Sequence, residues 1–451
     1  MKNNYRKEEY SEYIFVSLGC DKNLVDSEMM ITSLRKNGFV LTDDIEDADV
    51  IVVNTCCFIG DAKEESINTL IEMGGYKEGR CKLLVAAGCL AQRYHNEIKE
   101  DIPEVDLIVG TMGYEDLSEK INEALGGKGV LESLKDIDYL PTPLTDRDSM
   151  SGGYYAYLKI AEGCDKCCTY CVIPKVRGHY RSVPMDNLIA QAKHLVANGA
   201  KELILVAQET TLYGKDIYGE KSLPKLLEEL SKIDELKWIR ILYCYPEEIT
   251  DELISAIKNL PKVCHYLDMP IQHGSDDVLR RMGRWTNREQ IEKTVAKLRE
   301  EIPDIALRTT LITGFPGETE DDFEQVKEFV KKMEFDRLGV FTYSREEDTP
   351  AAEMDGQIDE EVKEARRDEI MQIQQDIAFD KSNSRVGEIY EVMIEGRLPD
   401  EGVYIARTYM DAPDVDGYVF IQSDYNLDSG DFVKVEVTRS DEYDLIAEII
   451  E

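Results

Sequence analysis

The chain has 451 residues and a formal net charge of −38, with 91 acidic residues against 53 Lys and Arg. This balance disfavours a nucleic-acid binder, because phosphates are neutralised by clustered Lys and Arg. It favours a basic partner, or it simply keeps the chain dissolved. Eleven cysteines without a signal peptide or membrane-spanning run indicate the reducing cytoplasm, where thiols bind metals instead of pairing. The length predicts about three domains.

Apolar runs separated by helical stretches open the chain and predict a parallel α/β sheet. The expected strands are Tyr13 to Leu18, Val50 to Val53, Lys82 to Ala86 and Asp106 to Val109, with helices at Ser27 to Lys36 and Ala62 to Met73. Three of the four runs lead into a cysteine, at Cys20, Cys56 and Cys89. Because the carboxyl ends of parallel strands line one edge of a sheet, we expect these thiols to converge on a metal cluster. Buried thiols acting as small hydrophobes would explain any one of them, but not the repeated placement.

A second cysteine pattern, C-x3-C-x2-C at Cys164, Cys168 and Cys171, follows the strand-like run Tyr154 to Ala161. Thiolates are the usual ligands of iron–sulfur clusters, and a four-iron cluster held by three cysteines keeps one iron open for an exchangeable ligand. A structural zinc site is the alternative, but such sites usually close with four ligands in paired C-x2-C spacings. Cys167 adjoins Cys168, so a set containing Cys167 instead is conceivable.

Six strand-then-helix units run to about Ser344 and predict an open, partial (β/α)6 barrel with its site at the carboxyl ends of the strands. The expected strands are Tyr154 to Ala161, Glu202 to Val206, Trp238 to Leu242, Tyr266 to Met269, Ala306 to Ile312 and Arg337 to Phe341. The expected helices are Met185 to Asn198, Leu223 to Lys232, Asp251 to Asn259, Arg288 to Glu301 and Glu320 to Met333. Pocket candidates near the strand ends or the cysteine run are Tyr170, Gln208, Glu209, Tyr243, Gln272, His273, Arg308, Gly314 and Phe315. By itself, the Gly-Phe-Pro-Gly turn at 314–317 favours a plain loop.

A charged helix from Asp359 to about Ser384 precedes short strands in period-two alternation, which predict a small antiparallel β-barrel. The expected strands are Ile389 to Ile394, Val403 to Ile405, Gly417 to Ile421 and Phe432 to Val437. From Arg385 to Glu451 there are 17 acidic residues against 5 basic ones, a net charge of −12. Such a surface repels phosphates and suits a strongly basic protein.

The cysteine run, with Tyr170 just before its last cysteine, resembles the radical S-adenosylmethionine (SAM) enzymes. In that family the open iron chelates the amino and carboxylate groups of SAM. Three further segments, Ser17 to Glu28, Asn54 to Ile59 and Gly88 to Arg93, resemble the cluster motifs of the methylthiotransferases, a radical SAM subfamily whose chains close with a TRAM domain. The resemblance covers essentially the whole chain.

Two positions depart from the family pattern. Asp21 stands where proline is frequent, and Cys57 stands where a small residue is usual. The second departure leaves Cys56 or Cys57 as the ligand.

The resemblance implies SAM and two 4Fe–4S clusters as cofactors. The expected catalytic and metal-binding residues are Cys164, Cys168 and Cys171 for one cluster and Cys20, Cys56 and Cys89 for the other. Electron transfer from the first cluster would cleave SAM to a 5′-deoxyadenosyl radical, and the second would present the sulfur. The implied domains are an N-terminal methylthiotransferase domain (1–140), a radical SAM domain (150–383) and TRAM (384–451).

Two branches of this family compete. One modifies an adenosine of tRNA, and the other methylthiolates the β-carbon of an aspartate in protein twelve of the small ribosomal subunit. Four segments resemble the protein-modifying branch: Leu18 to Asp26, Gln208 to Gly214, Leu267 to His273 and Thr408 to Asp414. The tRNA branch and a non-enzymatic iron–sulfur carrier or scaffold remain alternatives, and SAM cleavage would separate the last from the enzymes.

The expected substrate is therefore the basic ribosomal protein and not tRNA. We expect TRAM to bind it through acidic residues such as Asp411, Asp414 and Asp416. The other expected partners are an electron donor, such as flavodoxin or ferredoxin, and a sulfur donor. The expected location is the cytoplasm, without membrane contact.

Overall fold

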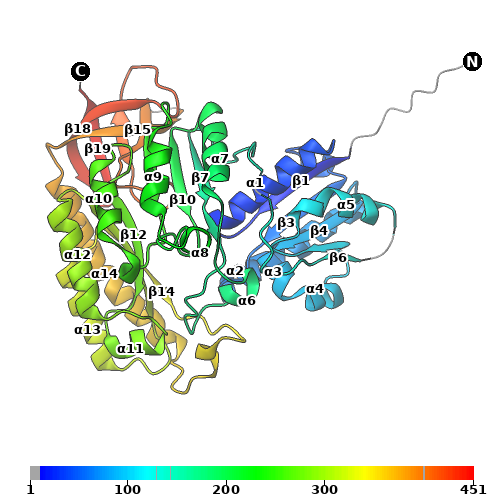
Figure 1. Cartoon of the computed structure of the whole chain (residues 1–451), viewed down its shortest axis with the longest axis horizontal. Coiled ribbons are helices and arrows are strands. Elements are labelled where there is room, and N and C mark those ends of the chain that lie inside the picture. Colours follow the sequence, from blue (N-terminus) through cyan, green and yellow to red (C-terminus); the bar gives the residue numbers. More distant parts are fainter. Residues whose placement is uncertain (1–10, 128–129, 143, 400–401, 451) are drawn as a thin grey trace, which may run out of the picture. The chain divides into compact units, whose positions relative to one another are not determined.

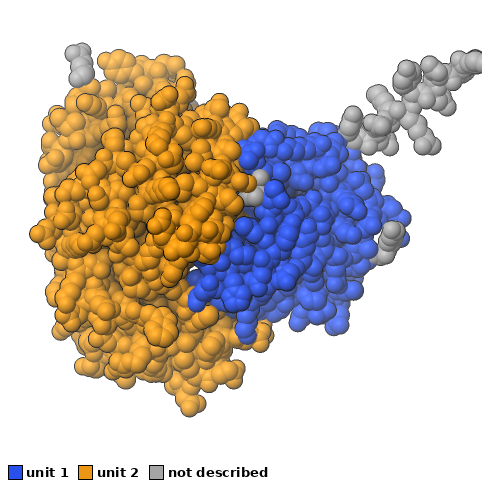
Figure 2. Space-filling model, in the orientation of Figure 1, with its two compact units in different colours: residues 1–150, 162–165, 172–181 blue, residues 151–161, 166–171, 182–451 orange. Residues whose placement is uncertain are grey.

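The structure is a computed structural model that describes residues 11–127, 130–142, 144–399 and 402–450. The chain forms two compact units, coloured separately in Figure 2. Unit 1 comprises residues 1–150, 162–165 and 172–181, and unit 2 comprises residues 151–161, 166–171 and 182–451. Within the described ranges, no helix is both long and apolar enough to cross a membrane.

Unit 1 is built on a six-stranded parallel sheet of order β2-β1-β3-β4-β5-β6. Figure 1 labels β1, β3, β4 and β6 of this sheet. The strands are β1 (Glu12–Ser17), β2 (Val40–Leu41), β3 (Val50–Thr55), β4 (Leu83–Gly88), β5 (Leu107–Val109) and β6 (Leu131–Ser133). The helices are α1 (Asp21–Lys36), η1 (Ile45–Asp47), α2 (Gly60–Gly75), η2 (Tyr76–Glu78), α3 (Cys89–Arg93), α4 (His95–Asp101), η3 (Tyr114–Asp116), α5 (Leu117–Leu125) and α6 (Ile173–Arg177). The predicted parallel sheet is confirmed, with β2 and β6 as additional short edge strands.

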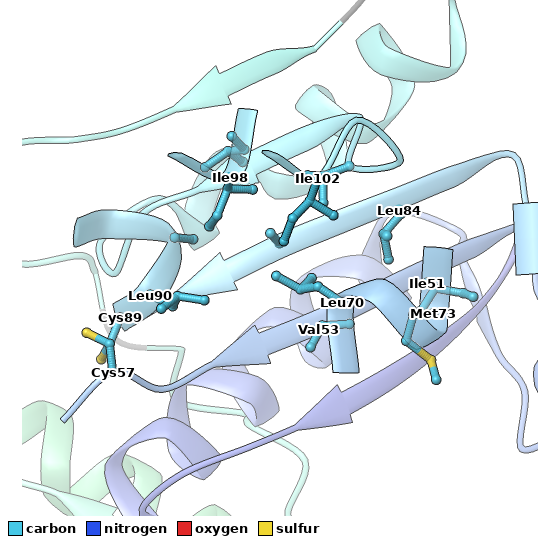
Figure 3. Packing of buried hydrophobic residues seen from close by; sticks show 14 of the residues in the cluster. Ile51, Val53, Cys57, Leu70, Met73, Leu84, Cys89, Leu90, Ile98 and Ile102 are labelled. Atoms are coloured by element: carbon cyan, nitrogen blue, oxygen red, sulfur yellow. The ribbon is translucent and has the colours of Figure 1, made fainter. Parts of the chain in front are cut away.

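Alternate residues of the central strands feed two cores on opposite faces of this sheet. Ile51 and Val53 of β3 pack into one cluster (Figure 3), whereas Val50 and Val52 pack into the other. All six residues of β3 are buried, as expected for a parallel strand covered on both faces. The central strands are thereby fixed in register, and so are the residues that follow them.

Unit 2 contains six parallel strands in sequence order, hydrogen-bonded as two halves, β7-β10-β11 and β12-β13-β14. A bond from Cys264 N–H to the Ile239 carbonyl, at 2.9 Å, links β11 to the segment that leads into β12. The strands are β7 (Tyr155–Lys159), β10 (Glu202–Val206), β11 (Trp238–Ile241), β12 (Tyr266–Gln272), β13 (Ala306–Thr313) and β14 (Arg337–Thr342); the short strands β8 (Ala161–Glu162) and β9 (Arg181–Ser182) pair separately.

The helices around this curved sheet include all of the predicted ones. They are α7 (Met185–Ala197), α8 (Lys215–Tyr218), α9 (Leu223–Ser231), η4 (Pro246–Glu248), α10 (Asp251–Asn259), α11 (Asp276–Arg281), α12 (Arg288–Glu301), α13 (Glu320–Met333), η5 (Pro350–Glu353) and α14 (Glu360–Ser384). Four of them, α8, α11, η4 and η5, are short and were not predicted. Asn287 and Thr319 form capping boxes that fix the starts of α12 and α13. The partial barrel of parallel strands is confirmed.

A closed five-stranded barrel of order β15-β16-β17-β19-β18 ends the chain. Its strands are β15 (Ile389–Leu398), β16 (Val403–Arg407), β17 (Val419–Gln422), β18 (Phe432–Asp441) and β19 (Asp444–Ile449). The predicted small barrel is confirmed, but one of its pairs, β17 with β19, is parallel. β19 was not predicted, and it supplies the strand that closes the barrel.

This C-terminal barrel packs against the amino-terminal ends of the parallel strands of unit 2 (Figure 1). Arg407 donates to Glu202, the first residue of β10, at 2.7 Å. Asp411 binds Arg337, the first residue of β14, at 2.5 Å. The carboxyl ends of the same strands, where a site is predicted, thus lie at the opposite end of the barrel.

Candidate functional site

The first cysteine set lies at the carboxyl edge of the unit 1 sheet, where each cysteine follows one of three neighbouring strands. Cys20 precedes α1 after β1, Cys56 follows β3, and Cys89 begins α3 directly after β4. Gly19 adopts φ +88°, and a Cβ built on it would lie 3.0 Å from the Cys56 Sγ. A side chain at Gly19 would therefore collide with the neighbouring cysteine, so this close approach requires glycine.

Electrostatics also groups the thiols of unit 1. Burial raises the pKa of Cys89, opposed by the Arg177 charge and reinforced by Cys57, Cys56 and Cys20. Burial likewise raises the pKa of Cys56. Because cluster ligands are thiolates, metal binding here must displace the protons that burial favours.

Arg177 is the buried cation of this set. Its Nη2 lies 3.4 Å from the Cys89 Sγ and 2.9 Å from an Asp26 carboxylate oxygen, while Nη1 donates to both oxygens of Glu162 at 3.1 and 3.0 Å. Three thiols near one buried and paired cation suit a cluster that adds negative charge beside it. Sequence reasoning missed Arg177, because an isolated arginine after a cysteine run carries no pattern of its own.

Cys57 is also buried and belongs to the same hydrophobic cluster as Cys89 (Figure 3). The structure therefore gives two adjacent thiols, Cys56 and Cys57, in the neighbourhood of Cys89. Among the described residues, no three His, Cys, Asp or Glu side chains have the spacing of a metal site. The choice of Cys56 as ligand remains a prediction.

The second cysteine set stands on the loop between β8 and α6. In unit 1, the Cys164 N–H donates to the Gly178 carbonyl at 3.1 Å. In unit 2, the Cys168 Sγ lies 3.7 Å from the Tyr245 hydroxyl. Cys167 is exposed with φ +53°, whereas Cys168 is buried. This difference favours Cys168 over Cys167 as the residue turned into the fold.

A buried arginine also accompanies this loop. Arg284 lies 4.1 Å above the Tyr245 ring, and its Nη2 donates to the Pro270 carbonyl at 2.9 Å. Its Nε and Nη1 have no hydrogen-bond partner within the described chain, although the residue is only 5% exposed. Tyr170, Tyr245 and Cys168 raise its pKa against the lowering effect of burial. Unmet donors of a buried cation mark a place for an anionic group.

Most of the predicted pocket residues lie where the barrel strands end. Gln208 and Glu209 follow β10, Tyr243 follows β11 with φ +60°, and Gln272 ends β12 with φ +80°. Left-handed backbone in non-glycine residues costs roughly 1–3 kcal/mol and gathers at functional sites. The Thr210 N–H donates to the Tyr243 carbonyl at 3.1 Å, so the ends of β10 and β11 lie together.

Glu209 is fully buried, and burial raises its pKa to about 7, against the hydrogen bond from Thr211 and the charge of Lys166. Lys166, from the cysteine loop, pairs with Glu248 at 2.5 Å. A carboxyl that changes charge near neutrality at the mouth of the barrel can hold or release a proton there.

The Gly314-Phe315 turn after β13 is held by the buried carboxylate of Glu318, the last residue of the run at 313–318 that the sequence marks as a pocket candidate. Glu318 accepts from the N–H groups of both turn residues, at 2.7 and 3.2 Å, and from Arg366 at 2.8 Å. Phe315 is buried in a cluster against which Tyr170 packs, so this turn and the cysteine loop are neighbours.

His273 is buried with its Nε2 facing Glu318 at 3.5 Å and therefore lies behind the turn. Arg308 is another predicted pocket residue that is engaged elsewhere. It pairs with Asp268 at 3.1 Å and with Asp416 at 3.5 Å, near the start of β13.

The expectation that Asp411 and Asp416 contact a partner is wrong. The side chains of both are buried against Arg337, and the Tyr266 hydroxyl donates to Asp416 at 2.8 Å. Asp414 is exposed but accepts from the Tyr155 hydroxyl at 3.0 Å. Sequence alone predicted exposure from charge, whereas these aspartates bind arginine and tyrosine side chains of the parallel-strand barrel.

Comparisons with known proteins agree with this architecture. The chain matches the family models "Radical SAM superfamily" over residues 158–330, "Uncharacterized protein family UPF0004" over 12–110 and "TRAM domain" over 386–450. It is 61% identical to the ribosomal protein uS12 methylthiotransferase RimO of Lachnoclostridium phytofermentans, over 96% of this chain and 98% of that protein. It is 51% and 50% identical to the RimO proteins of Acetivibrio thermocellus and Clostridioides difficile, each over 96% of this chain and 97% and 98% of those proteins.

A solved structure has the same fold. The radical SAM methyltransferase TsrM of Kitasatospora setae, with cobalamin and a [4Fe-4S] cluster bound, superposes with a TM-score of 0.54 over 88% of this chain and 80% of that one. The two sequences are 13% identical, so this likeness concerns the fold alone.

Proposed function

Because the chain belongs to the RimO family of ribosomal protein uS12 methylthiotransferases, we propose that it attaches a methylthio group to the β-carbon of an aspartate in protein uS12. It is a radical SAM enzyme that uses SAM and two 4Fe–4S clusters. The observation that carries the proposal is the grouping of Cys20, Cys56 and Cys89 at the carboxyl ends of three adjacent strands. SAM cleavage alone needs only the other cysteine set.

Both cysteine sets have the donor chemistry of an iron–sulfur cluster. Cys164, Cys168 and Cys171 would hold the cluster that supplies the electron for SAM cleavage, and Cys20, Cys56 and Cys89 would hold the cluster that supplies the sulfur. Each set offers three thiols and would therefore leave one iron of a four-iron cluster without a protein ligand. The division into domains at 1–140, 150–383 and 384–451 belongs to the same proposal.

The chain's own groups bind and orient the reactants. Arg284 offers two free N–H donors to an anionic group beside the cysteine loop. Gln208, Glu209, Tyr243, Gln272 and Tyr170 would line the SAM pocket, and Glu318 holds the Gly314-Phe315 turn against it. Phe315 and its apolar cluster would keep water from a reactive radical.

The basic partner uS12 is proposed to be attracted by the exposed acidic residues of TRAM. Asp424, Glu436 and Asp441 are exposed, unlike the buried Asp411. Since TRAM packs at the amino-terminal ends of the barrel strands, these charges would steer encounter and would not line the reaction site. A flavodoxin or ferredoxin, a sulfur donor and a cytoplasmic location complete the proposal.

A competition assay tests the substrate. The anaerobically reconstituted enzyme is incubated with SAM, reductant, uS12 and tRNA together, and the products are weighed by mass spectrometry. We expect a methylthio group on uS12. The same group on tRNA alone would favour the tRNA branch, and an absence of 5′-deoxyadenosine would favour an iron–sulfur carrier.

A charge-reversal variant tests the steering. Asp424→Lys, Glu436→Lys and Asp441→Lys together should slow uS12 association most at low salt while SAM cleavage continues. A chain with Glu361→Lys, Glu364→Lys and Asp368→Lys on α14 is the matched control for net charge. Equal losses in both would assign the effect to net charge and not to TRAM.

A further inference from the structure

Arg177 occupies an unusual position, because it ends α6 directly downstream of one cysteine set and contacts a member of the other. Its side chain is 2% exposed, and its Nη2 lies 3.4 Å from the Cys89 Sγ. The same guanidinium interacts electrostatically with Cys20. All of these residues lie within unit 1.

Other partners fix the guanidinium independently of the cysteine. Both carboxylate oxygens of Glu162 accept from Nη1, the Asn23 Oδ1 accepts from Nη2 at 2.5 Å, and an Asp26 carboxylate oxygen forms an ion pair with Nη2 at 2.9 Å. Asn23 is oriented in turn, because its Nδ2 donates to the Leu18 and Thr55 carbonyls at 3.1 and 3.0 Å. The N–H that faces Cys89 is therefore held in place before any ligand binds.

The Cys89 sulfur lies between two polar neighbours. Its Sγ is 3.6 Å from the Asn23 Oδ1 and 3.4 Å from the Arg177 Nη2, which is the N–H donor beside it. A cysteine that binds a cluster does so as a thiolate, which can only accept, and a charge-assisted bond to it is roughly twice as strong as a neutral one.

We propose that Arg177 is a positioning residue that holds the Cys89 thiolate as a cluster ligand and raises the reduction potential of the cluster on Cys20, Cys56 and Cys89. The inference rests on the proposed function, since it presumes that cluster. Reduction would add one negative charge to the cluster, and a nearby buried cation with an N–H aimed at a ligand sulfur would stabilise the reduced state. Arg177, which follows the Cys164–Cys171 segment in the chain, thereby adjusts the reduction potential of the cluster on the other cysteine set.

The test uses the full chain with Cys164, Cys168 and Cys171 replaced by Ala, so that the second cluster is read alone. Its midpoint potential is measured by an EPR-monitored redox titration in the parent, in Arg177→Lys and in Arg177→Gln. We expect Arg177→Gln to lower the potential clearly and Arg177→Lys to lower it less, because Lys keeps the charge but loses the fork geometry.

Arg147→Gln is the matched control, because Arg147 is an equally buried arginine of unit 1 that pairs with Glu28. It should lower thermal stability and leave the potential unchanged. Should Arg177→Gln fold poorly, a variant that also carries Asp26→Asn and Glu162→Gln removes the stranded charges while keeping the side-chain shapes. Loss of the cluster from this folded variant, but not from Arg147→Gln, would equally support the proposal.

A loaded Arg177→Gln protein with the parent potential would overturn the inference while leaving the proposed function intact. If the parent itself held no cluster on Cys20, Cys56 and Cys89, the proposed function would be refuted, and the inference, which presumes that cluster, would be refuted with it. Iron content and EPR signal of the parent separate these two outcomes before any variant is compared.

Discussion

Two cysteine sets in one chain offer the same number of thiols, but the fold gathers them differently. In unit 1 the thiols follow β1, β3 and β4, which are distant in sequence and adjacent in the sheet. The other set stands on a single loop between β8 and α6. A site whose residues come from several strands depends on the whole sheet being folded. A site whose residues lie on one loop depends only on that loop and on the residues that pack against it. Damage to the fold should therefore affect the first set more.

The buried arginines beside the two sets differ in the same way. Arg177 is bound by Glu162, Asp26 and Asn23, so its guanidinium is held in a fixed position. Arg284 lies against the Tyr245 ring and one carbonyl, with two N–H donors unmet within the described chain. A guanidinium fixed by the protein suits a resident group, and one with unmet donors suits an anion that binds and leaves.

The largest effect should come from removing one set at a time. Replacing Cys164, Cys168 and Cys171 by Ala should leave roughly half of the iron and abolish SAM cleavage, because each set holds one cluster. Replacing Cys20, Cys56 and Cys89 should preserve SAM cleavage and block methylthio transfer. Iron analysis and 5′-deoxyadenosine formation check both variants. Full iron content in either one would refute the two-set assignment.

The sequence was sufficient to predict those elements that show a regular pattern of apolar residues and capping side chains. The bounds of α10, α12 and α13 agree with the prediction, since Thr250, Asn287 and Thr319 mark their starts with capping side chains. Most pocket candidates were predicted correctly to lie at the carboxyl ends of the strands, because the strand ends could be located in the sequence. β19 was missed because it pairs through a hairpin turn of polar residues that hid the strand signal.

Contacts between distant charges were beyond the sequence. Arg177 and Arg284 each stand alone in the chain, and only the fold shows that they are buried and what they face. Asp411 shows the opposite error, because an acidic residue in an acidic domain predicts exposure until its partner Arg337 is seen. Ion pairs between residues that are distant in the chain produce no periodic pattern in the local sequence, so the sequence does not reveal them.

The buried carboxyl of the barrel site supplies a prediction on pH. Burial raises the pKa of Glu209 from 4.5 to about 7, so the native state keeps a proton that the unfolded chain releases above about pH 4.5. The free energy of unfolding therefore falls as pH rises between these values, by about 3 kcal/mol at most. Glu209→Gln should relieve this loss, stabilising the protein at pH 8 relative to its effect at pH 5. Urea unfolding at both pH values measures it.

Glu248→Gln is the control with the opposite sign. Hydrogen bonds from Lys166 and Lys221 outweigh burial and lower the pKa of Glu248, so its contribution is present at high pH and is lost on acidification. The substitution should therefore destabilise the protein at pH 8 and have less effect at low pH. If Glu209→Gln changed stability equally at both pH values, the carboxyl would not be protonated in the native state.

Arg284 should matter more for the ligand than for the fold. Arg284→Met removes two buried donors, and we expect the specificity constant for SAM to fall about tenfold or more, as for loss of a charged hydrogen bond. Arg280→Met on the exposed face of α11 is the control and should leave it unchanged. Measuring 5′-deoxyadenosine formation against SAM concentration decides this. A normal specificity constant in Arg284→Met would show that the unmet donors have no ligand.

The smallest effects should separate the two bystander thiols. Cys57 is 1% exposed in the core of unit 1, so Cys57→Ala should cost about 1 kcal/mol through the small cavity that it leaves. Cys167 is exposed with φ +53°, and Cys167→Ala should change stability by less than about 0.5 kcal/mol, whereas Cys167→Gly relieves the left-handed backbone. Both Ala variants should keep their cluster absorption if Cys56 and Cys168 are the ligands. A lost cluster in Cys57→Ala would move the ligand to Cys57, and the site in unit 1 would then take its third thiol from the residue packed beside Cys89.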